Sequence, residues 1–292
     1  MTHLGDLFEF ALESDPSRNY CLWEYSRPAP AEDKFRAINL LLYSFDVVGA
    51  LPRGLGIVDA IREEIGAFAS VFGVKWDGSD LGWEFYFYDY GRRNRSVSIE
   101  RVLKAIAPYH TSRSAPAEHL PYFMFSVDID PAPTGIAGAR PLDVIHAYIG
   151  NPGSTVSSGI SYGLRADGIV LENFYFFFDA MLQREEVIDK ICSSPFFDEM
   201  SDCLDDILIP ELRNCTTICI ANKKTHDCIY FSGVNVNQMV YFLIKMEYPK
   251  SIVNFIEDNL YNLNHLLFDV GFDYRVEGGV VRRFKAGFYS VF

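Results

Sequence analysis

Four segments of the chain alternate, residue by residue, between large apolar side chains and polar side chains that are rich in tyrosine. These segments are 81–90, 122–130, 144–149 and 284–292. Because successive side chains of a β-strand point to opposite faces, the alternation predicts strands with one apolar face and one polar face. Stretches with helical apolar spacing lie between them, so helices are available to cover the apolar faces. The polar faces must then border either water or an enclosed lumen.

The polar faces have the composition of a surface that lines a ligand site. Their residues are Glu84, Tyr86, Tyr88, Tyr90, Tyr122, Met124, Ser126, Asp128, Asp130, His146, Tyr148, Lys285 and Tyr289, with Arg283 placed on the same face as Lys285. A solvated face usually carries Lys, Glu, Thr and Ser, whereas tyrosine, histidine and isolated charges are typical of a pocket with a few converging polar groups. An ordinary antiparallel sheet with one face in water remains the alternative.

The remaining elements favour an α+β fold built on a closed antiparallel β-barrel. Further strands are predicted at 20–25, 159–164, 170–179, 216–223 and 228–233, and hairpin turns at Asp167-Gly168 and Gly278-Gly279. Helices are predicted at 4–12, 56–72, 96–107 with Ser98 as N-cap, 184–192, 236–246 and 251–259, while 32–48 fits a helix or a buried strand. About ten strands with interleaved helices suggest a sheet that closes on itself and is wrapped by helices.

Size and charge narrow the class of protein. A chain of 292 residues with 49% hydrophobic content can bury a large core, and no linker divides it, so one domain over 1–292 is predicted. The net charge of -13 opposes binding to nucleic acid or to an anionic membrane, which leaves small molecules or peptides as partners. Six cysteines without CxxC spacing, and no signal peptide or long apolar run, predict a cytoplasmic protein with reduced thiols.

Three C-terminal stretches carry a family resemblance: GISYGLRADGIVLENFYFFFD, TTICIANKKTHDCIYFSGVNVNQMVYFL and VVRRFKAGFYSVF. Their order of hairpins, helix and aromatic final strand resembles the ABBA or PT-barrel prenyltransferases, and within them the cyanobactin peptide prenyltransferases. A weaker likeness covers CLWEYSRPAPAEDKFRAINLLLY, where the family has a Glu on its first strand and an Arg at its second. These positions correspond to Glu24 and Arg36.

The resemblance implies transfer of a dimethylallyl or geranyl group from an isoprenoid diphosphate, with Mg²⁺ as a candidate cofactor of the donor, to a peptide side chain or to a small guanidine or aromatic acceptor. A leaving diphosphate needs cationic and hydroxyl donors, for which the candidates are Arg36, Arg165, Lys223, Arg283, Lys285, Tyr148, Tyr162, Tyr230 and Tyr289. Aromatic faces for the allyl cation are expected from Tyr86, Tyr88, Tyr175 and Phe177. The base is Glu24 by the family match or Glu84 by the strand pattern, and Asp128 and His146 complete the candidate substrate-binding set.

Other interpretations of these residues stay open. A non-catalytic α+β barrel that binds a hydrophobic or aromatic ligand would have the same lumen. Arg283 and Lys285 would also suit an edge strand that keeps the surface polar, and Lys223 lies at a hairpin tip. The segment 159–163 matches G-x-S-x-G, but a serine hydrolase needs a helix after the serine, and a hairpin is predicted there.

Overall fold

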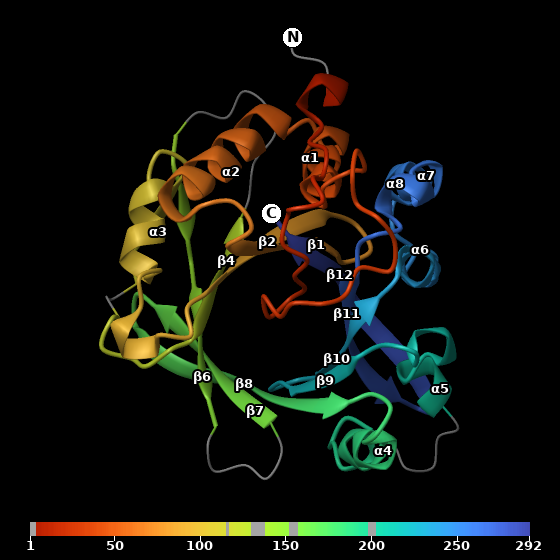
Figure 1. The fold of residues 1–292 in the computed structure, drawn as a ribbon. Coiled ribbons are helices and arrows are strands. Elements are labelled where there is room, and N and C mark those ends of the chain that lie inside the picture. The colour runs from red at the N-terminus through yellow and green to blue at the C-terminus, as the bar shows by residue number, and fades with distance from the viewer. Residues whose placement is uncertain (1–3, 115–116, 130–137, 152–156, 198–202) are drawn as a thin grey trace.

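Ten antiparallel strands close into a barrel in this computed structural model, which describes residues 4–114, 117–129, 138–151, 157–197 and 203–292. Around the barrel the strands follow the order β1, β12, β11, β10, β9, β8, β7, β6, β4, β2, and β2 pairs with β1 to close the ring (Figure 1). Helices lie outside it. The predicted α+β barrel of about ten strands is therefore confirmed.

The strands of the barrel are β1 (Ser70–Trp76), β2 (Leu81–Tyr88), β4 (Met124–Ile129), β6 (Ile145–Gly150), β7 (Ser157–Arg165), β8 (Gly168–Asp179), β9 (Thr217–Asn222), β10 (Asp227–Val234), β11 (Phe268–Glu277) and β12 (Val280–Val291). A separate parallel pair is formed by β3 (His110–Ser112) and β5 (Arg140–Leu142). The helices are α1 (Ile38–Val47), α2 (Leu51–Ile65), α3 (Ile99–Ala105), α4 (Arg184–Cys192), α5 (Leu204–Ile207), α6 (Val236–Lys245), α7 (Lys250–Asp258) and α8 (Leu260–Leu263), with short 3₁₀ turns η1 (Leu4–Leu7), η2 (Arg92–Asn94) and η3 (Pro210–Leu212).

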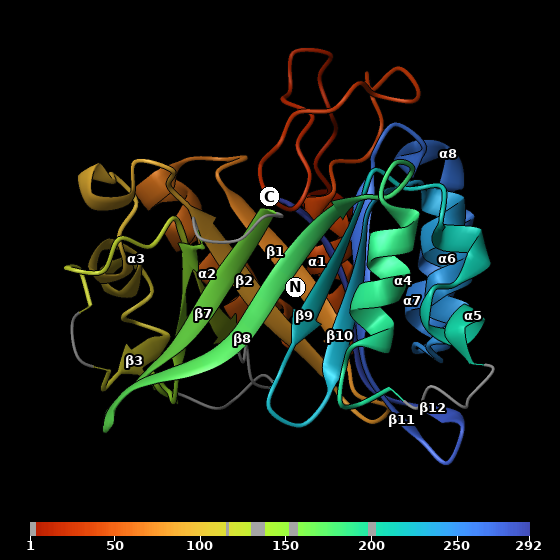
Figure 2. The ribbon, with the colours of Figure 1, turned by 90° about the horizontal axis from the view of Figure 1, so that it is seen from below.

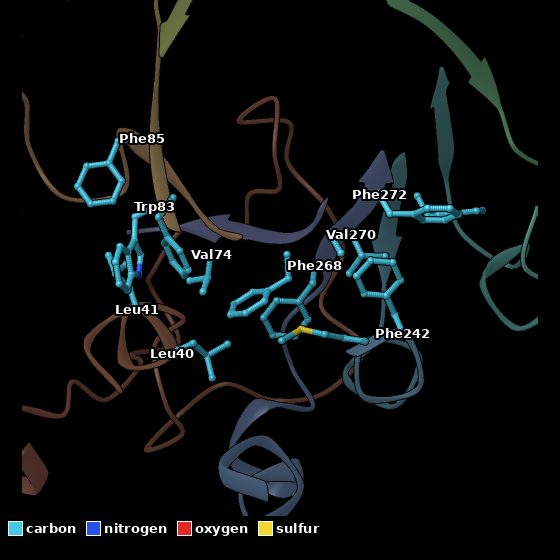
Figure 3. Packing of buried hydrophobic residues seen from close by; sticks show 14 of the residues in the cluster. Leu40, Leu41, Val74, Trp83, Phe85, Phe242, Phe268, Val270 and Phe272 are labelled. Carbon is cyan, nitrogen blue, oxygen red and sulfur yellow. The ribbon is translucent and has the colours of Figure 1, made fainter. Parts of the chain in front are cut away.

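The main hydrophobic core lies between the outer face of the barrel and the helices. Trp83 of β2 lies against Leu41 of α1, and Val270 and Phe272 of β11 lie near Phe242 of α6 (Figure 3). Each such side chain gives roughly 1.5–3 kcal/mol when it is fully buried. Because the apolar sides of the strands are used in this outer layer, their polar sides face the lumen, as the alternation predicted. The exceptions are at the start of one segment, where Tyr122 packs in the outer core and Phe123 lies on the lumen side.

The two ends of the barrel differ. The hairpins β1–β2, β7–β8, β9–β10 and β11–β12 all turn at one end. Residues 8–37, which we call the N-terminal segment, lie over the other end: Figure 1 looks along the barrel and shows this segment crossing the middle of the ring, and Figure 2 shows it projecting from the end opposite the hairpins. The lumen is thus covered at one end by irregular chain.

Several predicted elements near the N-terminus are wrong or need new limits. The helix predicted over 56–72 ends at Ile65, because Gly66 adopts φ 93° and Ser70 begins β1. The helix predicted over 4–12 is reduced to η1, and the strand predicted over 20–25 is only an isolated bridge between Arg18 and Glu24.

Other elements follow the sequence closely. The ambiguous stretch 32–48 contains α1. Ser98 is the N-cap of α3, where its side chain accepts a hydrogen bond from the backbone N–H of Arg101 at 3.2 Å. None of the described helices has the length and apolar character needed to cross a bilayer.

Candidate functional site

The lumen contains a polar cavity of about 110 Å³ near the hairpin end of the barrel. We call this the polar mouth and define it by its charged residues, which come from six strands and one hairpin: Lys75, Glu84, Asp128, His146, Lys223, Asp273 and Lys285. Each strand contributes a side chain at alternate positions, so the closure of the barrel makes these charges converge. The polar mouth combines three lysines with three carboxylates and one histidine.

Lys75 of β1 lies at the centre of one ion-pair group. Its ammonium contacts the Glu84 carboxylate and lies 3.4 Å from Oδ1 of Asp128. Burial, together with repulsion from Lys285, lowers the pKa of Lys75 to about 8. Glu84 also accepts hydrogen bonds from the hydroxyl of Tyr86, at 2.7 Å, and from that of Ser126. The buried carboxylate of Glu84 therefore has three donors around it.

Lys223 and Asp273 form a second pair, with 2.6 Å between Nζ and Oδ1. His226 Nε2 lies 3.2 Å from the other carboxylate oxygen. Burial alone would raise the pKa of Asp273, but its interaction with the adjacent His226 and the charges of Lys223 and Lys285 hold it well below its usual value. The surrounding cations thus favour the ionised form of Asp273.

A third group lies at the rim. The carboxylate of Glu172 of β8 lies 2.5 Å from Nδ1 of His146 and 2.9 Å from Nη2 of Arg165. Burial opposes ionisation of Glu172, but these two partners lower its pKa. Lys285, by contrast, is exposed in the mouth and has no hydrogen bond or ion pair with any residue of the described ranges. It is the cation most readily available to an anionic ligand.

Six tyrosines form a belt across the middle of the lumen: Tyr20, Tyr86, Tyr148, Tyr175, Tyr230 and Tyr289. The ring of Tyr20, from the N-terminal segment, lies at the centre, 5.2 Å from the ring of Tyr86 and 5.5 Å from that of Tyr289. Glycines make room for these rings, since a Cβ on Gly73 would lie 2.6 Å from the ring of Tyr289. Burial raises the pKa of all six phenols, so they stay protonated donors at neutral pH.

Beyond the belt lies a smaller apolar cavity of about 30 Å³, which we call the deep chamber. Four belt tyrosines also border it, and its other lining residues are Cys21, Tyr88, Phe123, Met124, Gly159, Phe177, Cys219, Ser232 and Asp269. The lumen therefore changes from charged at the hairpin end, through phenolic, to apolar beneath the N-terminal segment.

Most of the sequence-predicted site residues come together in this lumen. Nine of them line the polar mouth or the belt: Glu84, Asp128, His146, Tyr148, Tyr175, Lys223, Tyr230, Lys285 and Tyr289. Arg165 reaches the rim through Glu172. Asp130 lies outside the described residues.

Four predicted residues lie elsewhere. The side chain of Glu24 is 79% exposed and pairs with Arg18 at 3.7 Å. Arg36 is bound by Asp15 at 2.8 Å and Glu9 at 3.1 Å within the N-terminal segment. Neither lines the polar mouth or the deep chamber. Glu24 falls where the predicted strand over 20–25 is absent, and Arg36 lies just before α1, so the family match does not bring either residue into the lumen.

The other two residues lie on the outer face of the barrel. Tyr162 pairs with Ala147 and Leu171, and it shares its side of β7 with Leu164 of the outer core. Arg283 pairs with Tyr274, and it contacts Asp206 from outside the sheet. Arg283 lies on the outer face because β12 contains a bulge. One extra residue separates Arg283 from Lys285, so the two side chains point to opposite faces of the sheet.

Sequence reasoning missed four residues of the lumen. Lys75 was missed because no strand was predicted at its position, and the first residues of β1 (70–72) were assigned to the end of a helix. Asp269 and Asp273 alternate with Phe268, Val270 and Phe272 in β11, so the period-two signal was present there. Tyr20 comes from irregular chain, and no pattern indicates that its ring enters the barrel.

No cluster of three or more His, Cys, Asp or Glu in the described part of the chain is arranged to hold a metal ion. Cys21, Cys215, Cys219 and Cys228 are buried thiols. No protein family and no curated protein matches this chain.

Proposed function

We propose that this protein is a prenyltransferase whose active site is the barrel lumen. It would transfer a dimethylallyl or geranyl group from an isoprenoid diphosphate to a peptide side chain or to a small guanidine or aromatic acceptor. One observation carries the proposal: within a closed barrel, three lysines and six tyrosine hydroxyls converge in an order that runs from cationic mouth to aromatic interior. An amphiphilic donor with an anionic head and an apolar chain has the same order.

The polar mouth would receive the diphosphate. Lys285 is free to bind it directly, and Lys75 and Lys223 would each exchange part of a carboxylate contact for a phosphate oxygen. The hydroxyls of Tyr230 and Tyr289 would add neutral donors. Charge-assisted hydrogen bonds of this kind stabilise the charge that develops on a leaving diphosphate, most strongly where little water is present.

The tyrosine belt would hold the allyl group. Ring faces attract a carbocation through their quadrupole, and they offer it no lone pair as reactive as water. Closure of the opposite end by Tyr20 and the N-terminal segment limits the water that can reach the cation.

The reaction would proceed by displacement at the first carbon of the donor. The bond between this carbon and the diphosphate oxygen breaks, and the diphosphate leaves with the electron pair. The nucleophilic atom of the acceptor forms a new bond to the same carbon and loses its proton. Glu84 is the proposed base, because it lies in the lumen and is connected through Ser126, whose hydroxyl lies 3.2 Å from that of Tyr148, to the belt. The exposed Glu24 is not in reach of the lumen.

Mg²⁺ would enter the polar mouth on the oxygens of the diphosphate, while the lysines and tyrosines keep the roles given above. It is therefore treated as a variable of the binding experiment.

The test is calorimetric titration with unreactive thiolodiphosphate analogues of the C5 and C10 donors, at pH 7 with and without Mg²⁺. We expect saturable binding that Lys285→Ala weakens about tenfold or more, since one charged hydrogen bond is worth roughly 1.5–3 kcal/mol. Arg283→Ala is the matched control, because this nearby cation lies on the outer face and its loss should leave the affinity unchanged.

Binding of neither analogue would overturn the proposal. Incubation with true donor and candidate acceptors then tests the chemistry: wild type should form prenylated product, and Glu84→Gln should lose most of the rate while retaining analogue binding. Analogue binding without any product from a broad acceptor panel would favour the non-catalytic ligand-binding barrel.

A further inference from the structure

The deep chamber contains two buried polar atoms that have no hydrogen-bond partner among the described residues. They are Oδ1 of Asp269 and the hydroxyl of Tyr88. Asp269 is 1% exposed and Tyr88 is 5% exposed, and both line the same cavity. The other carboxylate oxygen of Asp269 accepts the backbone N–H of Tyr20 at 2.7 Å. One oxygen thus fixes the N-terminal segment. The Ser232 hydroxyl and the Gly233 N–H also lie near the carboxylate, but Oδ1 makes no hydrogen bond of normal geometry with any described residue.

An unpaired polar atom in an apolar site is costly, because it has lost its hydrogen bonds to water. The usual explanation is a water molecule or a ligand that supplies the missing partner. The cavity volume of about 30 Å³ exceeds the roughly 10–15 Å³ that a single water molecule needs. The chamber thus has room for a small ligand group that carries a hydrogen-bond donor.

The residues that line the chamber indicate what kind of hydrogen-bond donor it would bind. The rings of Tyr88, Tyr148, Tyr175, Phe123 and Phe177 surround it, together with Tyr20. Aromatic faces and a buried carboxylate both attract a cation, and this pair of features is used to bind ammonium groups. No lysine or arginine lines the deep chamber within the described residues, whereas three lysines line the polar mouth.

We propose that the deep chamber is a binding site for a small organic ammonium group attached to an apolar body, held by Asp269 Oδ1 and the surrounding rings. The role of this site in catalysis rests on the proposed prenyl transfer. In that reaction the ammonium group would hold the acceptor in place. A displacement requires the nucleophile to approach opposite the leaving group. The diphosphate lies at the mouth, so the acceptor approaches from the side of the deep chamber.

The binding step is tested without any donor. Isobutylammonium and its neutral counterpart isobutanol are titrated into the full chain at pH 7.5 and followed by NMR. We expect saturable binding of the ammonium, at least tenfold tighter than that of the alcohol. Asp269→Asn should remove this preference, whereas Asp128→Asn, which removes a carboxylate of the polar mouth, should leave it intact.

Tyr88→Phe is the second variant, because it keeps the ring and removes only the unpartnered hydroxyl. It should weaken ammonium binding several-fold, and it keeps the question decidable if Asp269→Asn does not fold. Equal binding of the ammonium and the alcohol, no binding of either, or loss of the preference in Asp128→Asn alone would each overturn the proposal. The failure of this experiment is separate from that of prenyl transfer, since donor-analogue binding depends on the lysines of the polar mouth.

Discussion

Asp269 shows how a single residue can lower the stability of a fold. Burial raises the pKa of its carboxyl to about 6, and only part of this effect is offset by Ser232 and by the N–H groups of Tyr20 and Gly233. The folded state thus holds the proton more tightly than the unfolded chain, in which the carboxyl of Asp269 has an ordinary pKa. The contribution of this group to stability therefore falls as pH rises from about 4 to about 6.

We predict that Asp269→Asn is at least as stable as the wild type at pH 7, by up to roughly 3 kcal/mol, because each unit of pKa shift is worth about 1.4 kcal/mol. The advantage should shrink as pH falls to 4, where the wild-type carboxyl is protonated. The neighbouring Cys21, Cys215 and Tyr25 have pKa values raised by burial and stay neutral in this range. Urea unfolding of both proteins at pH 4, 5.5 and 7 measures the difference; a variant clearly less stable at pH 7 would contradict the prediction.

The alternation of apolar and polar side chains was the sequence feature that correctly predicted which residues face the lumen. It placed Glu84, Asp128, His146 and Tyr148 on the lumen side of three strands. It failed at Arg283, because a bulge adds one residue to the count and no feature of the sequence marks its position. A period of two therefore identifies a face reliably only as far as the strand stays regular.

Among the elements, α6 has the clearest local start. Asn235 accepts a hydrogen bond from the backbone N–H of Gln238 at 3.0 Å, and the Gln238 side chain accepts that of Asn235 at 3.0 Å. This reciprocal capping box satisfies two N–H groups that would otherwise lack partners in the helix. The apolar face that follows carries Met239, Phe242 and Leu243 into the outer core.

We predict that Asn235→Ala lowers the free energy of unfolding by about 1 kcal/mol, the usual cost of removing a helix N-cap. The side chain is exposed, so no cavity contributes to the loss. Asn235→Ser is the control, since serine also caps helices well and should retain most of the stability. Chemical denaturation measures both, and an equal loss in the two variants would show that the cap is not the cause.

Elements with such local signals were predicted well, and those without them were not. The limits of α4 agree with the predicted 184–192, and Ser98 caps α3 as expected. The helix predicted to continue to residue 72 failed at Gly66, where local helical spacing persists in sequence but a positive φ ends the helix and long-range pairing with β12 takes over. Contacts between distant parts of the chain decide such boundaries, and a short window of sequence does not contain them.

For the whole molecule, closure of the barrel determines what must fold together. β1 pairs with both β2 and β12, so residues 70–76 are held against the last strand of the chain. The number and polarity of the strands predicted a closed sheet, since a barrel leaves no exposed edges. The covering of one end by the N-terminal segment was not predicted, because its contacts with β11 and the tyrosine belt join residues about 250 positions apart.

The prediction of a single domain over residues 1–292 has a direct test in the three tryptophans, Trp23, Trp76 and Trp83. All three lie in the first third of the chain. Trp83 is buried in the outer core with its Nε1 donating to the Ser44 hydroxyl at 2.8 Å, whereas Trp23 is half exposed. Tryptophan fluorescence therefore reports on the N-terminal part of the barrel, while far-UV circular dichroism reports on every helix and strand.

We expect urea unfolding curves from the two signals to coincide, because the loss of β1 or β2 would open the barrel and expose two unpaired strand edges and the lumen at once. Trp23→Phe, which removes the exposed reporter, should leave the fluorescence midpoint unchanged. A fluorescence transition at clearly lower urea than the dichroism transition would mean that the α1–β2 region unfolds on its own. The chain would then consist of more than one cooperative unit, and the lumen would be able to open without global unfolding.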